Sequence, residues 1–307
     1  AQGAGCTKGC IMPGKKKRIE KADAIPCELS AQFRDRIQSY KDALVAAAPD
    51  IGDHGLDPED FWRSGLFRSA IEKLRGTQAA SMSKKKDFID RALDRLKKSG
   101  RITEFAFTGA GDRHDYQVIL PGGKQSIFEA KGCLDGNNAT IYQRPPNADE
   151  FLIWSLCQNP GADPKHNLWS GVHTRLGGKI IAEKERMDAL IVWDMLCGSP
   201  GRPCPKLNDK GRGIVIGGQK VPPPCVYLFP RTVPDPRNNP APVVWKLSEV
   251  GLAAALVEEF GGDERDVTEV HIETKMKGAS VERKTTLVRQ GVTVVESDWT
   301  ELKRASR

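Results

Sequence analysis

The sequence predicts a mixed α/β protein in which helices flank a central sheet, with a helical N-terminal region and a small β-rich C-terminal extension. Three observations lead to this prediction. Apolar residues recur at helical spacing through the first hundred residues. Short runs rich in β-branched and aromatic residues begin after Gly100. Further runs of this kind return after Asp266 and complete the chain.

The helices of residues 1–100 are marked by their capping residues. Ser30 and Ser83 are suited to begin helices, and Pro58 is suited to the first position of another. Gly100 is typical of the residue that follows a helix. The predicted helices span 30–49, 58–76 and 83–100.

Three short strands are predicted next, at 102–108, 114–120 and 125–131. Glycines and Asp112 separate the first two runs, and Pro121-Gly122-Gly123 separates the second and third. Such turn residues favour a meander of adjacent antiparallel strands.

Beyond the meander, the continuous apolar run 189–193 has the pattern of a buried central strand. A helix is predicted before it and another after Ser248. The remaining predicted strands either extend the main sheet or form a small terminal one. The segments are an apolar stretch at 151–156, a helix at 170–186, an excursion at 197–224, strands at 226–229, 267–274, 285–288 and 292–295, and a helix from Ser248 to Gly261. We therefore divide the chain into a helical region (1–100), a core with an insertion around 197–224 (101–230) and an extension (231–307).

Composition narrows the class of protein. The net charge of +7 favours polyanionic partners. No apolar run approaches the roughly 18–20 residues needed to cross a bilayer, so no membrane association is expected. The first residues contain no apolar segment typical of a signal peptide, which makes a reducing cytoplasm the default expectation.

The eight cysteines raise the question of zinc, because a chain without a signal peptide does not suggest a disulfide framework. Two groups could each supply three ligands, although neither contains a CxxC pair or an evident fourth ligand. The alternative is that these are buried or idle thiols. The groups are Cys6, Cys10 and Cys27, and Cys197, Cys204 and Cys225.

Candidate catalytic residues lie in the meander. Asp115 opens the second strand, and Glu129 and Lys131 lie two residues apart on the third, so alternation directs both onto one face. Other Glu-x-Lys tripeptides begin at Glu273, Glu282 and Glu301. The first has an acid, Asp266, only seven residues before it with no turn between them, and the other two do not lie in predicted apolar strands. A solvent-facing hairpin with incidental charges is the alternative interpretation.

An acidic residue opening one strand, followed by Glu-x-Lys on its antiparallel neighbour, resembles the PD-(D/E)xK nuclease superfamily, which includes many type II restriction endonucleases. His114 stands where the family has its nominal proline. The resemblance extends over 66–193 and implies a restriction-endonuclease-like mixed sheet with Asp115, Glu129 and Lys131 as catalytic residues. It also implies Mg²⁺ held by Asp115, Glu129 and the backbone carbonyl of Ala130. Glu72 and Glu104 are candidates for an additional acid.

The resemblance implies Mg²⁺-dependent hydrolysis of double-stranded DNA, most naturally by a homodimeric type II restriction endonuclease whose N-terminal region helps to grip DNA. Repair, transposon-associated and modification-dependent nucleases share this core and remain open. A non-catalytic nucleic-acid-binding protein, with or without zinc, is the rival from another class. Candidate DNA contacts, chosen because such side chains bind phosphates or base edges, are Asn137, Asn138, Gln143, Arg144, His173 and Arg175.

The catalytic hypothesis makes a demand on strand register. Directly opposed residues of an antiparallel pair share a face. A two-residue Gly122-Gly123 turn would set Asp115 opposite Ala130 and separate it from Glu129 by the thickness of the sheet. We therefore predict an odd number of loop residues, or a bulge, between Asp115 and Glu129, with their carboxylates roughly 4–6 Å apart so that both could bind one metal ion.

Overall fold

The computed structural model describes residues 31–52, 54–67, 69–71, 82–109, 114–131, 144–157, 173–195, 197–198 and 203–302. Its α-helices are α1 (Ala31–Ala47), α2 (Pro58–Ser64), α4 (Met82–Lys98), α6 (His173–Glu183) and α7 (Gly251–Glu259). Its strands are β1 (Glu104–Phe107), β2 (Tyr116–Ile119), β3 (Gln125–Lys131), β4 (Glu150–Cys157), β5 (Ala189–Asp194), β6 (Ile214–Ile216), β7 (Gln219–Val221), β8 (Cys225–Leu228), β9 (Val267–Lys277), β10 (Ser280–Arg289), β11 (Val292–Glu296) and β12 (Thr300–Glu301). Short 3₁₀ turns are η1 (Ala48–Asp50), η3 (Pro205–Leu207), η4 (Leu247–Glu249) and η5 (Glu264–Asp266).

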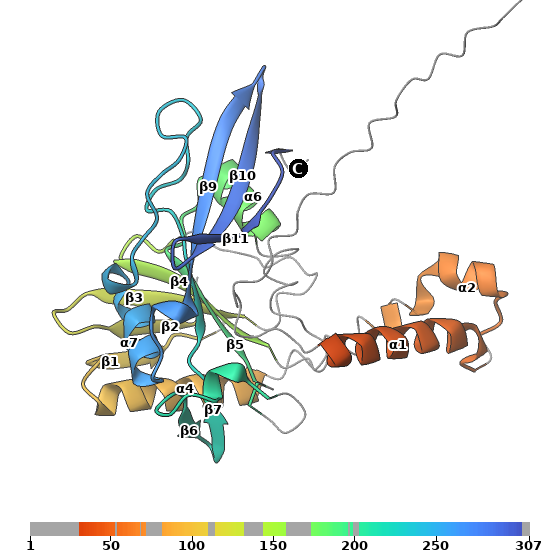
Figure 1. Ribbon diagram of the computed structural model, residues 1–307, viewed down its shortest axis with the longest axis horizontal. Helices are drawn as coiled ribbons and strands as arrows, with labels where there is room; N and C mark the ends of the chain where they lie inside the picture. The colour runs from red at the N-terminus through yellow and green to blue at the C-terminus, as the bar shows by residue number, and fades with distance from the viewer. Residues whose placement is uncertain are drawn as a thin grey trace, which may run out of the picture.

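A single mixed sheet organises the molecule, in the order β1-β2-β3-β4-β5-β8-β9-β10-β11, with β12 paired to β10 (Figure 1). The predicted antiparallel meander is confirmed as β1-β2-β3. β4 and β5 then add in parallel to β3, as expected for a buried, continuously apolar strand such as β5. β8 returns antiparallel and β9 is parallel to β8, so the C-terminal strands extend the main sheet.

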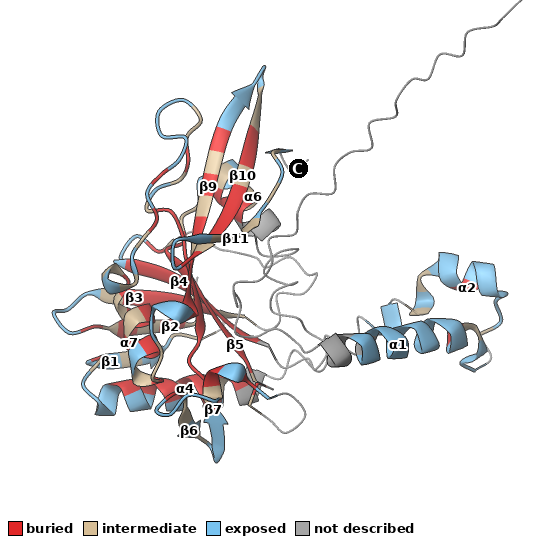
Figure 2. Ribbon diagram, in the orientation of Figure 1, coloured by how far each residue is buried: buried red, intermediate tan, exposed pale blue. Residues whose placement is uncertain are grey.

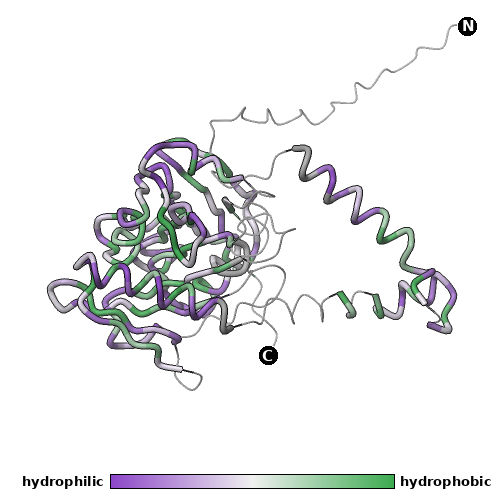
Figure 3. The backbone as a smooth tube through the Cα atoms, turned by 90° about the horizontal axis from the view of Figure 1, so that it is seen from below, coloured by the Kyte–Doolittle hydropathy of each residue, from purple (hydrophilic) through white to green (hydrophobic). Residues whose placement is uncertain are grey.

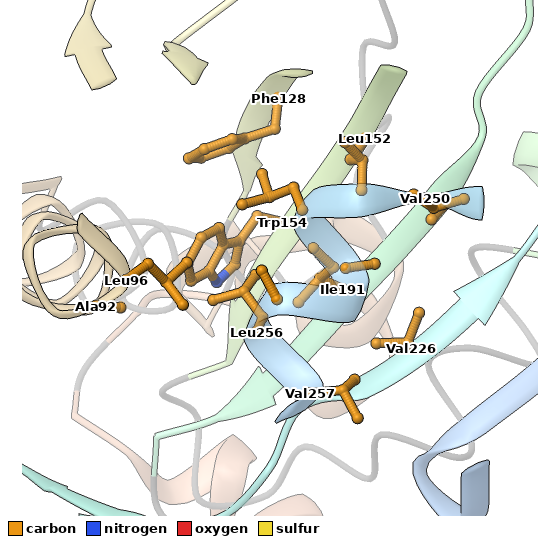
Figure 4. Packing of buried hydrophobic residues seen from close by; sticks show 14 of the residues in the cluster. Ala92, Leu96, Phe128, Leu152, Trp154, Ile191, Val226, Val250, Leu256 and Val257 are labelled. Atoms are coloured by element: carbon orange, nitrogen blue, oxygen red, sulfur yellow. The ribbon is translucent and has the colours of Figure 1, made fainter. Parts of the chain in front are cut away.

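One face of the sheet packs against α4 and α7. Helix α4 contributes Phe88, Ala92 and Leu96 at helical spacing, and α7 contributes Leu256 and Val257. Figure 4 shows side chains of both helices around those of the central strands, with Trp154 and Ile191 between them. Because strand side chains alternate, every second residue of β3, β4 and β5 enters this layer.

The opposite face carries a second apolar layer. Ile127, Ile153 and Leu190 come from three neighbouring strands, and Ile180 of α6 packs on them. The central strands are therefore buried on both sides, as Figure 2 shows for β3, β4 and β5. This second layer is the one that continues into the candidate site, because Glu129 shares the parity of Ile127 along β3.

The excursion at 197–224 is fixed to the sheet by buried charges. Asp266, next to the start of β9, pairs with Lys206 Nζ at 2.9 Å and Arg212 Nη2 at 2.5 Å. All three side chains are almost completely buried, so each charge depends on its partner. Within the excursion β6 and β7 form a separate two-stranded hairpin.

The N-terminal arm, defined as residues 31–71, lies apart from the sheet in both Figure 1 and Figure 3. Helix α1 agrees with the predicted helix at 30–49. The helix predicted at 58–76 is interrupted: α2 ends at Ser64 and Gly65 adopts a left-handed conformation with φ of 71°, after which the described residues up to Ile71 are helical again. Asp57 caps α2 by accepting the N–H of Asp60, as the Asp-Pro start suggested.

Among the helices of the described ranges, none combines the length and the apolar composition that a membrane span requires.

Candidate active site

The turn between β2 and β3 determines which side chains meet. Leu120 donates its N–H to Lys124 O at 2.8 Å, and Gly123 donates to Leu120 O at 3.0 Å, so Pro121, Gly122 and Gly123 form a three-residue loop. Both glycines have positive φ, which other residues rarely adopt. The predicted odd-numbered loop is confirmed.

This loop sets the register of the two strands. Tyr116 lies opposite Phe128, and continuing that register by one residue sets Asp115 opposite Glu129. Lys131 shares the face of Glu129, since two residues along a strand restore the direction of the side chain. Glu129 and Lys131 thus share one face of β3, and Asp115, a bend residue directly before β2, lies beside them at the same end of the meander.

Asp115 is held on both sides by backbone hydrogen bonds. Its N–H donates to Phe128 O at 3.3 Å, and its carbonyl accepts the N–H of Thr108 at 2.9 Å. The hydroxyl of Thr108 donates to His114 O at 2.6 Å. The position of Asp115 is therefore fixed by the end of β1 as well as by β3.

The Asp115 carboxylate also bonds to the neighbouring strand, accepting the N–H of Ala130 at 2.7 Å through Oδ2. The hydrogen-bonded pair of Leu120 and Lys124 fixes the alternation along β3, so Ala130 directs both its N–H and its carbonyl toward β2. The Ala130 carbonyl therefore lies on the Asp115 side of β3, the position that the resemblance assigns to a backbone metal ligand.

Glu129 and Lys131 form an ion pair, with Lys131 Nζ 2.6 Å from Glu129 Oε1. The Glu129 side chain is only 11% exposed and that of Lys131 is 21% exposed. Burial raises the pKa of Glu129 above its ordinary value, Lys131 lowers it, and repulsion from Asp115 raises it again. The net rise means that folding confines negative charge in a poorly solvated place.

The neighbouring strand β4 places one apolar and one polar side chain next to Glu129 and Lys131. In the parallel register Ile153 lies opposite Glu129, and Ser155 lies opposite Lys131. Ile153 is fully buried in the second apolar layer, which accounts for the desolvation of Glu129. Ser155 is also buried and brings a hydroxyl to the level of the lysine.

A divalent cation suits the chemistry of this donor set. Two carboxylates that repel one another and a backbone carbonyl offer hard oxygen ligands, and Mg²⁺ uses few protein ligands while retaining water. Within the described residues no group of three His, Cys, Asp or Glu side chains is arranged to hold a metal. Asp115, Glu129 and Ala130 are therefore the candidates, and a third side-chain ligand is not evident in that part of the chain.

The structure does not support Glu104 as an additional acid. Glu104 pairs with Ile119, four residues along β2 from Asp115, which separates them by roughly 13 Å at the usual rise of a strand. Glu104 is also exposed. The other candidate, Glu72, lies outside the described residues.

Arg144, predicted to contact DNA, has hydrogen-bond partners within the protein. Its Nη1 donates to the buried carboxylate of Asp188, and its Nη2 donates to Ala148 O and Asp149 O. The Arg144 guanidinium therefore bonds to residues that directly precede β4 and to Asp188, which precedes β5. Asn137, Asn138 and Gln143 lie outside the described residues. His173 and Arg175 lie in α6, but the structure does not describe their side chains.

Cys197, Cys204 and Cys225, the second cysteine group, form no disulfide among the described residues and are buried in the second apolar layer. No metal-holding group includes them in the described ranges. Cys6, Cys10 and Cys27 fall outside those ranges, so zinc binding there stays a prediction.

Two features near the site were not anticipated from the sequence. Tyr116 donates to Asp90 of α4 at 2.7 Å, and Lys86 Nζ lies 2.5 Å from the same carboxylate, which ties α4 to the start of β2. Both ring nitrogens of His114 are buried without a hydrogen-bond partner. The helical spacing of Lys86 and Asp90 was visible in the sequence, but their link to Tyr116 depends on how α4 packs.

Comparison with known proteins adds no family to this geometry. No family model, curated protein or solved structure matches the chain.

Proposed function

We propose that this chain is a metal-dependent endonuclease of the PD-(D/E)xK type that hydrolyses phosphodiester bonds in double-stranded DNA, most naturally as a type II restriction endonuclease with a restriction-endonuclease-like core. The observation that carries the proposal is the three-residue loop Pro121–Gly123. It sets Tyr116 opposite Phe128, so Asp115, directly before β2, lies beside the end of β3 that carries Glu129 and Lys131. A hairpin with incidental charges has no reason to meet this condition.

The order of the elements supports the same proposal. A helix, an antiparallel meander, a strand added in parallel to the meander, and a helix leading to another parallel strand occur as α4, β1-β2-β3, β4, α6 and β5. The resemblance implies the order helix, three-stranded meander, helix and strand, and β4 is an additional strand within it. The net charge of +7 is consistent with a polyanionic substrate.

Burial gives the proposed site a second line of support. A surface ion pair is normally well solvated and contributes little. Glu129 is instead almost buried, its pKa is raised, and the charges of Asp115 and Lys131 both act on it. Titratable groups perturbed in this way are concentrated at functional sites.

The roles follow from these positions. Asp115 and Glu129 would hold Mg²⁺ together with the Ala130 carbonyl, and Ala130 N–H keeps the Asp115 carboxylate in place. The bound ion would supply Lewis-acid neutralisation of the charge that develops on the attacked phosphate. Lys131, kept close by Glu129, would orient the attacking water or stabilise the negative charge of the transition state.

The test is cleavage of a supercoiled plasmid in Mg²⁺ and in EDTA. Asp115→Asn, Glu129→Gln and Lys131→Met should each abolish cleavage. Glu104→Gln, a carboxylate substitution at the far end of the same meander, should leave it intact. Retained cleavage in any two of the three site variants would overturn the proposal.

A parallel measurement of DNA binding in Ca²⁺ separates the rival function. A nuclease should bind DNA in Ca²⁺ without cutting it, and then cut when Mg²⁺ replaces Ca²⁺. DNA binding without cleavage in any divalent ion would favour the non-catalytic nucleic-acid-binding protein.

A further inference from the structure

The N-terminal arm exposes an unusual amount of apolar surface. Eight of the thirteen large apolar side chains that are exposed in the described chain lie within residues 40–71, although the arm is a small part of it. Of the residues described in that range, Ala48 and Phe61 are the buried ones. The exposed side chains are Tyr40, Leu44, Val45, Ile51, Leu56, Trp62, Leu66 and Ile71. Figure 2 shows α1 and α2 as almost entirely exposed, and Figure 3 shows hydrophobic stretches along them.

These side chains occur on both segments of the arm. On α1, Tyr40 and Leu44 are four residues apart and so lie on one side of the helix. Trp62 of α2 joins a small cluster with Phe61 and Phe67, its ring centroid 5.4 Å from each. An ordered surface of this kind is more typical of an interface than of a solvated face.

The net charge of the arm bears on which kind of partner could cover its apolar side chains. Residues 31–71 carry five Lys or Arg against seven Asp or Glu, a net −2, whereas the rest of the chain is +9. A segment that gripped DNA would be basic. The arm is the acidic part of a basic chain, so residues 31–71 themselves are not the part of the N-terminal region whose charge favours DNA.

Within the arm the two segments have opposite charge. Residues 31–47, which form α1, have three basic and two acidic side chains, a net +1. Residues 48–71 have two basic and five acidic side chains, a net −3. A twofold interface places the same surface on both copies, so the α1 segment of one copy can face the 48–71 segment of the other. Both the apolar side chains and the charges are then complementary.

We propose that the N-terminal arm is a dimerisation surface, and that its occupant is the arm of a second copy of this chain. The inference is independent of the nuclease assignment, because it uses no residue of the proposed active site. It assigns the protein's self-association to residues 31–71 rather than to the sheet.

The experiment is sedimentation equilibrium of the full chain without DNA. The wild type should form a dimer, and the double variant Tyr40→Glu, Leu44→Glu should sediment as a monomer. Trp62→Ser should weaken the dimer from the other segment. Because these side chains are exposed in one copy, the variants should fold normally, which circular dichroism checks. Val243→Glu, at an exposed apolar residue outside the arm, is the matched control and should remain dimeric.

A second pair of variants tests the charges. Arg36→Glu with Lys41→Glu makes α1 acidic and should raise the dissociation constant at least tenfold, whereas Lys97→Glu with Lys98→Glu on α4 should not change it. A monomeric wild type, or a dimer unaffected by both arm variants, would overturn the proposal. So would a monomer whose arm variants lose affinity for a DNA duplex, since the arm would then bind nucleic acid.

Discussion

Lys131→Met should destabilise the protein at neutral pH by an amount set by the Glu129 ion pair. Lys131 Nζ lies 2.6 Å from Glu129 Oε1, and the two side chains are 21% and 11% exposed, respectively. In burial, the pair is intermediate between a surface ion pair and a buried one. Breaking a buried pair costs about 3–5 kcal/mol, whereas an exposed pair is worth about 0–1 kcal/mol. We therefore expect a loss of about 2 kcal/mol in the free energy of unfolding, because methionine fills the volume but leaves Glu129 without its cation.

The pH dependence follows from the direction of the Glu129 pKa. That pKa is raised in the folded protein, so the carboxyl favours folding below its ordinary pKa and loses this contribution as pH rises through the folded value. Removing Lys131 removes the effects that lower this pKa, which moves it further upward. The cost of Lys131→Met should therefore be largest at neutral pH and should narrow as Glu129 becomes protonated in both proteins.

Urea denaturation at neutral pH and at a pH of about 4.5 measures both quantities, provided that the m-value is unchanged. A double-mutant cycle with Glu129→Gln isolates the interaction, and its coupling energy should account for most of the effect. A cost that is the same at both pH values, or a coupling energy near zero, would show that Lys131 acts on stability through packing alone.

Three further predictions concern residues around the site. Asp188→Ala should lower the free energy of unfolding by about 3–5 kcal/mol in urea denaturation, because the buried carboxylate accepts hydrogen bonds from Phe151 N, Arg186 Nε and Trp245 Nε1. His114→Phe should leave stability within about 1 kcal/mol of the wild type in thermal unfolding, since the ring nitrogens have no partner to lose. Gly122→Ala should lower the free energy of unfolding by about 1–2 kcal/mol in chemical denaturation. The cause is the φ of 90° alone, because no atom lies within 4 Å of the added carbon, and a larger loss would contradict this reasoning.

The meander and its register were predictable because they depend on nearby residues. β-Branched and aromatic runs indicated the strands, and the Pro-Gly-Gly sequence indicated a tight turn. The requirement that Asp115 face Glu129 then excluded a two-residue loop, and the structure has three loop residues. Local pattern and chemical demand together were sufficient at this point.

The sequence did not reveal contacts between distant residues. Arg144 was assigned to DNA on residue type, and its bond to Asp188, 44 residues later, was not foreseen. No sequence pattern around Arg144 predicts its bond to Asp188. The helix predicted at 58–76 ignored Gly65, whose left-handed conformation ends α2 although the apolar spacing continues. Glu104 carried the right charge, but only the pairing of β1 with β2 shows how far it lies from Asp115.

The order of strands in the main sheet follows the order of the chain from β1 to β11, and this affects how the protein forms during synthesis. Each new strand can add to an edge that already exists, without insertion between earlier strands. Asp115 directly precedes β2 and Glu129 and Lys131 lie in β3, so all three fall within residues 104–131, the span of the first three strands. The covering of Trp154 and Ile191 by α7 comes about a hundred and fifty residues after the sheet begins. Until α7 emerges from the ribosome, an apolar face and an open strand edge stay exposed, and this is the stage at which the nascent chain is most prone to aggregate.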